Sequence, residues 1–192
     1  MKFTKVFVIV SGVFVLVSAG AALAHEAAVT MSISGPGAIN DSTIQAGQPV
    51  DLDIYCANDT NRTGFALGFA IKSPDIKAIT HVADSGNGMN PGGDVKGYNA
   101  WKDKTIFDFD LGANEVDWDG KLPDLIGMWG LCIKRSLPPI EPTKAFSFRI
   151  IVPDTGTLVV DSSYFPPAGT WLYAPPATTP AWGGPYQFKV VK

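Results

Sequence analysis

An acidic segment, residues 108–120, carries the side chains whose types and spacing most suggest metal chemistry. Oxygen-bearing side chains recur along it at short intervals: Asp108, Asp110, Asn114, Glu115, Asp117 and Asp119. Ca²⁺ prefers such oxygen ligands. The segment ends like the opening of an EF-hand loop, but Ile126 stands where that loop needs its closing carboxylate, which excludes an EF-hand. We hypothesise an irregular Ca²⁺ site in a loop, the alternative being a solvated acidic loop; we expect no other cofactor.

Aromatic residues in predicted loops are the second candidate group. Trp and Tyr rings stack on sugar rings and bury a large area at low entropic cost. The candidate ligand-binding residues are Tyr98, Trp101, Trp118, Trp171 and Tyr173. The alternative interpretation is that these rings cover the ends of the apolar core.

The chain has two cysteines, Cys56 and Cys132, and each lies in a predicted strand. In an exported protein a cysteine pair is more often oxidised than free. We therefore expect a Cys56–Cys132 disulfide, the alternative being two buried thiols.

No complete catalytic site is recognisable in the sequence, and we predict that the chain is not an enzyme. Asp117, Asp119 and Asp124 could supply the paired carboxylates of a glycosidase, but carboxylates are common in loops and nothing else indicates a substrate cleft. No Ser-His-Asp arrangement stands out.

The N-terminus has the three parts of an export signal. Lys2 and Lys5 precede the apolar run Val6–Val17, and Ala22-Leu23-Ala24 is a small-residue cleavage site. We predict removal of residues 1–24 and a single secreted domain over residues 25–192, with no membrane attachment after cleavage. An uncleaved membrane anchor is the alternative.

Cleavage at that site creates one remote enzyme alternative. It would leave His25 with a free amino group, and His81 is the other histidine of the chain. Copper polysaccharide monooxygenases bind their metal through an N-terminal histidine and a second histidine, and these donors suit Cu(II). No other motif of those enzymes is present.

Composition favours a folded all-β domain and argues against a nucleic-acid partner. The 192 residues are 46% hydrophobic and 17% charged, enough apolar material for one core. The net charge of −3 is the wrong sign for a basic nucleic-acid footprint. Twenty glycines and 15 prolines suit many short strands joined by turns.

Alternating apolar residues predict about nine strands without a helix, and hence a two-sheet antiparallel β-sandwich of jelly-roll or Ig-like type. The expected strands are 28–34, 50–56, 65–71, 76–82, 105–111, 126–134, 145–152, 157–161 and 186–191. Residues 83–104 and 112–124 are expected to be loops, and the Pro-rich stretch before the last strand to be mostly irregular.

The central prediction is a hairpin formed by Val50–Cys56 and Phe65–Ile71. Its larger apolar residues should face the core. Asp51, Asp53 and Tyr55 would then face outward on one strand, beside the small residues Ala66, Gly68 and Ala70 on the next. Such a face needs either a cover within the chain or a partner.

Two stretches, GQPVDLDIYCAN…GFALGFAIKSPD and FSFRIIVPDTGTLVVDSSYF, resemble the cohesin-like and carbohydrate-binding-module-like β-sandwich superfamily. The resemblance implies the sandwich fold and a non-catalytic module that binds an extracellular protein or a carbohydrate. The alternative function is a self-associating subunit of a surface layer, filament or matrix, located at the cell surface or outside the cell.

Overall fold

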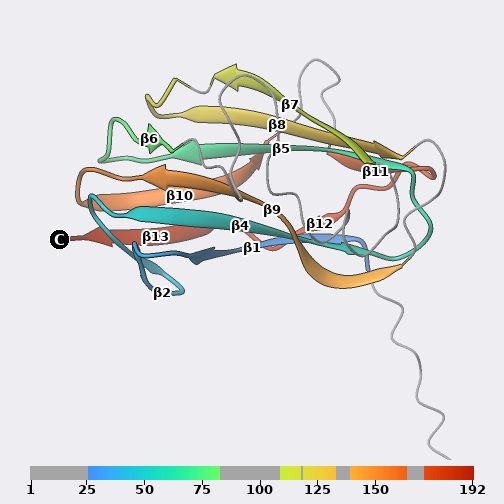
Figure 1. Cartoon of the computed structure of the whole chain (residues 1–192), viewed down its shortest axis with the longest axis horizontal. Coiled ribbons are helices and arrows are strands. Elements are labelled where there is room, and N and C mark those ends of the chain that lie inside the picture. The colour runs from blue at the N-terminus through green and yellow to red at the C-terminus, as the bar shows by residue number, and fades with distance from the viewer. Residues whose placement is uncertain (1–25, 83–108, 118, 133–138, 164–170) are drawn as a thin grey trace, which may run out of the picture.

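The computed structural model describes residues 26–82, 109–117, 119–132, 139–163 and 171–192. These residues form thirteen strands in two sheets and contain no helix (Figure 1). Accordingly, no helix in these ranges is long and apolar enough to cross a membrane. The expected all-β, two-sheet architecture is thus confirmed.

The five-stranded sheet has the order β12-β1-β4-β9-β6. Its strands are β1 (Ala28–Ser34), β4 (Pro49–Asn58), β6 (Thr80–His81), β9 (Ile140–Ile151) and β12 (Ala181–Trp182). All neighbours pair antiparallel except β1 and β12, which are parallel.

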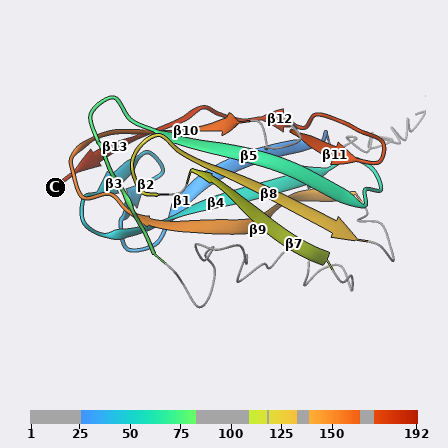
Figure 2. The same ribbon diagram turned by 90° about the horizontal axis from the view of Figure 1, so that it is seen from above.

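The eight-stranded sheet has the order β2-β3-β13-β10-β5-β8-β7, with β11 also paired to β5. Its strands are β2 (Ala38–Asn40), β3 (Thr43–Gln45), β5 (Gly64–Lys72), β7 (Phe109–Asp117), β8 (Asp124–Cys132), β10 (Gly156–Ser163), β11 (Leu172–Ala174) and β13 (Tyr186–Val191). The parallel pair here is β3 and β13. Figure 2 shows β10, β5 and β13 of this sheet in one layer and β4 and β9 of the other sheet in a second.

The predicted pairing of the central hairpin is wrong. β4 pairs with β1 and β9, whereas β5 pairs with β8, β10 and β11 in the other sheet. The residues predicted to face inward on both strands are buried, but they meet across the core instead of side by side. Asp51, Asp53, Gly68 and Ala70, which were predicted to face outward, are buried as well. A strand–turn–strand pattern is the same in both arrangements, because only the partners of each strand differ.

The core lies between the two sheets and follows the predicted alternation. Leu52, Ile54 and Cys56 of β4 have no exposed surface, and Phe65, Leu67, Phe69 and Ile71 of β5 are at most 4% exposed. Of the large hydrophobic residues that the structure describes, Ile39 alone is exposed, at 51%.

Three predicted elements differ from the structure. β7 occupies Phe109–Asp117, which had been assigned mostly to a loop. The expected strand 76–82 is reduced to Thr80–His81. The Pro-rich stretch contains two short strands, β11 and β12. Strands of two or three residues are too short to show periodicity, so sequence alternation could not reveal them.

Candidate functional site

The outer face of the eight-stranded sheet is built around the small residues of β5. Because successive side chains of a strand alternate between faces, Ala66, Gly68 and Ala70 belong to the face opposite Phe65 to Ile71. Ala66 is partly exposed there, whereas Gly68 is buried and Ala70 is 1% exposed. Gly68 pairs with Gly127 of β8 and with Ser163 of β10, so three strands contribute small residues at one level. Of the three β5 residues on this face, Ala66 is the one with appreciable exposed surface.

Charged groups flank the small residues. Ala70 pairs with Asp161 of β10, and the Lys72 Nζ atom lies 3.8 Å from an Asp161 carboxylate oxygen. The Lys72 side chain is 51% exposed and that of Asp161 33% exposed. At these exposures solvent screens the attraction between the Lys72 and Asp161 charges. Either side chain can therefore pair with a charged group of another molecule instead.

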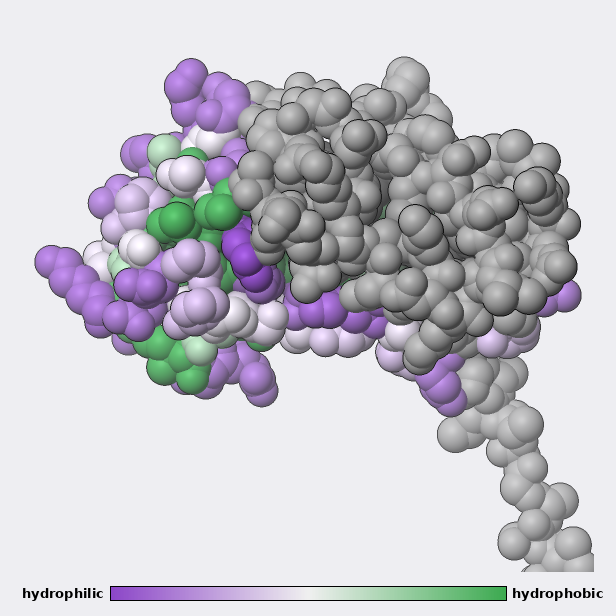
Figure 3. All heavy atoms as spheres, in the orientation of Figure 1, coloured by the Kyte–Doolittle hydropathy of each residue, from purple (hydrophilic) through white to green (hydrophobic). Residues whose placement is uncertain are grey.

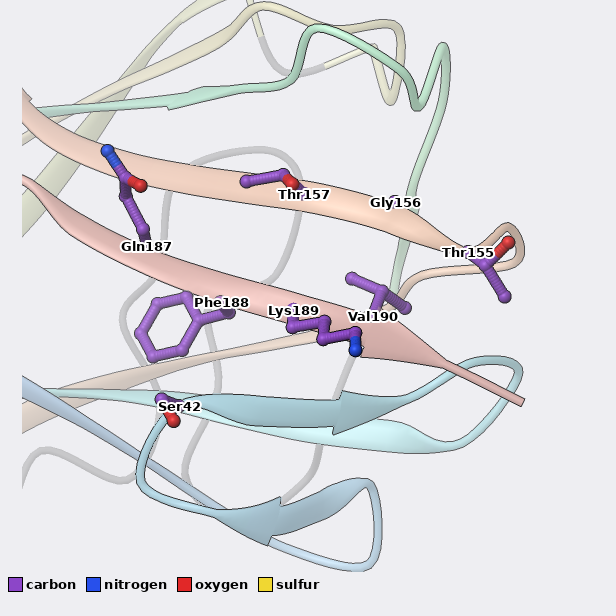
Figure 4. Close-up of a pocket in the computed structure, with 8 residues that line it drawn as sticks. All are labelled: Ser42, Thr155, Gly156, Thr157, Gln187, Phe188, Lys189 and Val190. Carbon is purple, nitrogen blue, oxygen red and sulfur yellow. The ribbon is translucent and has the colours of Figure 1, made fainter.

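An open depression of about 660 Å³ lies over β10 and β13, next to the turn before β3 (Figure 4). Its walls come from β10, β13 and the turn before β3: Ser42, Thr155, Gly156, Thr157, Gln187, Phe188, Lys189 and Val190. Gln187 and Lys189 are exposed, whereas Phe188 and Val190 belong to the core. Lys189 is the ionisable side chain among these lining residues, so the depression has one cation and no catalytic grouping.

The acidic residues on the outer face of the five-stranded sheet already have partners. Asp51 accepts two hydrogen bonds from Arg149, at 2.6 and 2.8 Å. Asp53, 2% exposed, accepts from Ser147 and from Ser34 at 2.7 Å. Figure 3, in the orientation of Figure 1, shows hydrophilic residues interspersed with hydrophobic ones on the coloured part of the one face in view. The prediction that β4 and β5 share one outer face is wrong, because the two strands lie in different sheets.

Trp171 and Tyr173 do not form the expected exposed platform. Tyr173 has no exposed surface and Trp171 is 8% exposed. Tyr173 pairs with Phe65 through β11, and its hydroxyl donates a hydrogen bond of 3.3 Å to the carbonyl oxygen of Ala28 in the opposite sheet. Tyr173 belongs to β11, which pairs with β5 in the same sheet, and Trp171 directly precedes that strand. Tyr98, Trp101 and Trp118 lie outside the described residues.

The candidate Ca²⁺ ligands belong to a strand, not to a loop. Asp110, Asn114, Glu115 and Asp117 are all in β7, which pairs with β8. Asp119 is exposed and its two oxygens accept hydrogen bonds from the backbone and side chain of Lys121, at 2.8 and 3.1 Å. Asp108 lies outside the described residues. Within the described ranges, no three His, Cys, Asp or Glu side chains are grouped to hold a metal.

The expected disulfide is not formed: Cys56 is a free, fully buried thiol. Burial raises the pKa of this thiol to about 12, although a hydrogen bond with Tyr173 acts in the opposite direction. Tyr173, in β11, is thus the hydrogen-bond partner of Cys56 in the core. Cys132 ends β8, where its backbone pairs with Phe109.

His81 and Asp124 form a buried pair that the sequence did not reveal. His81 Nε2 lies 2.6 Å from Asp124 Oδ2, and the second Asp124 oxygen accepts a 3.3 Å hydrogen bond from the backbone of Gly120. Burial raises the pKa of Asp124, although its bond to His81 acts against this. The pair joins the two sheets. His25, the other histidine of the copper hypothesis, lies outside the described residues.

No protein-family model matches this sequence, and no curated protein matches it. Solved structures do match it in fold. One is a type II cohesin from Acetivibrio cellulolyticus, in a structure described as a type II cohesin–X-dockerin complex. It has 11% sequence identity and a TM-score of 0.52, over 86% of this chain and all of that one.

Two further matches from Acetivibrio cellulolyticus have lower TM-scores. A type II cohesin domain from the cellulosome is 13% identical with a TM-score of 0.49, over 85% of this chain and 95% of that one. A type II cohesin module from the adaptor ScaA scaffoldin is 10% identical with a TM-score of 0.48, over 72% of each chain. The fold is a cohesin-like β-sandwich, as the sequence resemblance implied.

Proposed function

We propose that this chain is an extracellular, non-catalytic module that binds a folded protein partner on the outer face of its eight-stranded sheet. The observation that carries the proposal is the partly exposed Lys72–Asp161 pair, which lies at the end of the β5 row Ala66, Gly68 and Ala70. Within that row Ala66 is partly exposed, so a partner can approach the sheet there, whereas Gly68 and Ala70 are buried. The complex in which one cohesin of similar fold was solved supports a protein partner.

Charge and hydrogen bonding favour this face over the opposite one. On the five-stranded sheet, the outward Asp51 and Asp53 are nearly buried and bonded to Arg149, Ser34 and Ser147. A partner that docked there would have to break the hydrogen bonds of Asp51 and Asp53, and leaving these buried carboxylates without donors would cost free energy. On the eight-stranded sheet, Lys72 and Asp161 are partly exposed, so contacts with a partner can replace their contacts with water.

Site-specific photocrosslinking tests the face. A photoreactive residue placed at Lys72 marks the eight-stranded sheet, and one at Thr30, which pairs with Tyr55 on the five-stranded sheet, is the matched control. Each protein is irradiated with the extracellular proteins of the organism that produces it. We expect an adduct of one defined mass from the Lys72 position and none from Thr30.

Three outcomes would contradict the proposal. They are equal adducts from both positions, no adduct from Lys72, or an adduct with twice the mass of this chain. The last would point to self-association, and light scattering of the purified protein would then show a dimer. Export is tested separately: sequencing of the secreted protein should begin at His25.

A further inference from the structure

A second, smaller pocket lies at the end of the sandwich, where β10 extends beyond β13. The last β10 residue paired with β13 is Val160, and the following residues to Ser163 pair with β5 only. A pocket of about 380 Å³ opens there. Its lining residues are Ser162, Ser163, Trp171, Thr179, Pro180 and Trp182. This volume falls in the lower part of the range of about 300–1,000 Å³ that small-molecule sites occupy.

Two tryptophan rings form adjoining walls of this pocket at a wide angle. The centroids of Trp171 and Trp182 are 5.7 Å apart and the rings are inclined by 76°. Both rings also meet Phe69 of the core in edge-on contacts, at 5.5 and 5.8 Å. The core therefore supports the two walls from behind.

Hydrogen bonds hold each ring in place. Trp171 Nε1 donates to the carbonyl oxygen of Pro180 at 2.9 Å, and Trp182 Nε1 donates to Asp161 Oδ1 at 3.2 Å. Both indole N–H groups are thus used within the protein. Trp182 is partly exposed and Trp171 is 8% exposed, so what the rings offer a ligand is a limited apolar carbon surface. Its fixed orientation lowers the entropic cost of binding.

The remaining lining groups determine which ligand fits. Ser162, Ser163 and Thr179 add three hydroxyl groups, and none of the described lining residues is ionisable. A purely apolar ligand would bury those hydroxyls without partners. A charged ligand would find no opposite charge on the wall. A sugar ring has apolar C–H faces for the indoles and hydroxyls that can pair with those of the pocket.

We propose that the Trp171–Trp182 pocket binds one ring of a neutral sugar, either free or as part of a glycan. This site adjoins the protein-docking face, since Ser163 pairs with Gly68 and Asp161 accepts the Trp182 hydrogen bond, but the proposal does not depend on the proposed partner. A sugar bound there would contact the tryptophans through its C–H face and Ser162, Ser163 and Thr179 through its hydroxyls.

Nuclear magnetic resonance of the indole N–H groups tests the proposal, since the chain has five tryptophans. The purified protein is titrated with cellohexaose, xylohexaose, mannohexaose, chitohexaose and galactose, each to millimolar concentration. We expect at least one sugar to shift the Trp171 and Trp182 signals with a saturable response. Substituting each tryptophan by Phe in turn assigns the signals.

Two matched variants locate the binding. Thr179→Tyr fills the pocket mouth, and Ala177→Tyr places the same side chain at an exposed position of the same segment, outside the lining. We expect T179Y to abolish the shifts and A177Y to retain them. The double variant S162A/S163A should bind about tenfold more weakly, the effect of losing about 1.4 kcal/mol.

Each contrary result is decisive. The proposal is overturned if no sugar of the panel shifts these signals, or if T179Y binds as well as the unmodified protein. It is also overturned if tetramethylammonium or an aliphatic alcohol shifts the Trp171 and Trp182 signals while every sugar leaves them unchanged.

Discussion

The thiol of Cys56 lies in the apolar core, and burial sets its reactivity. With its pKa raised to about 12, the group stays protonated near neutral pH, and the thiolate is the reactive form of cysteine. In a Cys132→Ser variant, where Cys56 is the sole cysteine, we expect no modification by iodoacetamide at pH 8 in the native state. Modification should become rapid in urea.

Peptide mapping of the alkylated protein measures this directly. The unmodified chain, alkylated under denaturing but non-reducing conditions, should carry a label on Cys56. A Cys56–Cys132 peptide recovered intact would show that the cysteines are oxidised and would contradict the free thiol.

Asp124 makes a second prediction at the scale of single residues. Its pKa is raised by burial, so the folded state binds this proton more tightly than the unfolded state. As pH rises through the interval between the ordinary carboxyl pKa of about 3.9 and the raised value, Asp124 should therefore lower the free energy of unfolding. This effect is absent once the carboxyl is replaced.

The comparison with Asp124→Asn isolates that contribution. The free energy of unfolding of the unmodified protein, minus that of the variant, should fall as pH rises through this interval. Urea denaturation at a series of pH values measures it, with Asp119→Asn as the exposed control. A difference that grows with pH would show that the pKa of Asp124 is lowered instead.

At the scale of elements, Arg62 joins two loops that are remote in sequence. It is 2% exposed, and its guanidinium donates to Asp59 at 2.7 Å, to Thr178 at 2.9 Å and to the carbonyl oxygen of Pro176. These bonds attach the β4–β5 connection to the segment between β11 and β12. The segment that carries the sugar pocket is thereby anchored to the sandwich.

We expect Arg62→Ala to lower the free energy of unfolding by about 3 kcal/mol, because it removes several hydrogen bonds and leaves buried acceptors without donors. Asp59→Asn should cost less, since the Asp59 side chain is 33% exposed and can be solvated. Chemical denaturation of both variants measures the difference. An equal cost for the two would place the stabilisation in the Arg62–Asp59 pair alone.

At the scale of the whole molecule, the two sheets share one core and cannot form independently. β4 and β5 are consecutive strands in different sheets, and Phe69 of one sheet contacts Phe148 of the other at 5.8 Å. We therefore expect a single cooperative unfolding transition. Far-ultraviolet circular dichroism and tryptophan fluorescence should give coincident urea curves. Separate midpoints would mean that the sheets unfold as independent units.

The strands themselves were largely predictable, because alternation reports burial locally. β1 and β13 have the predicted bounds, and the inward residues of β4 and β5 are core as expected. The candidate site was less predictable. For Trp171 and Tyr173 the sequence left open an exposed ligand platform or a cover for the ends of the core, and the structure buries both side chains.

By itself, the sequence determined the fold class and the inward face of each long strand, because a period of two places every second side chain in the core. Only the tertiary structure decided which strands pair, that Cys56 meets Tyr173, and that His81 meets Asp124. Because β4 and β5 pair in different sheets, Ala66, Gly68 and Ala70 lie in one sheet and Asp51 and Asp53 lie in the other. Such contacts join residues far apart in the chain, and no local pattern of residue types carries that information.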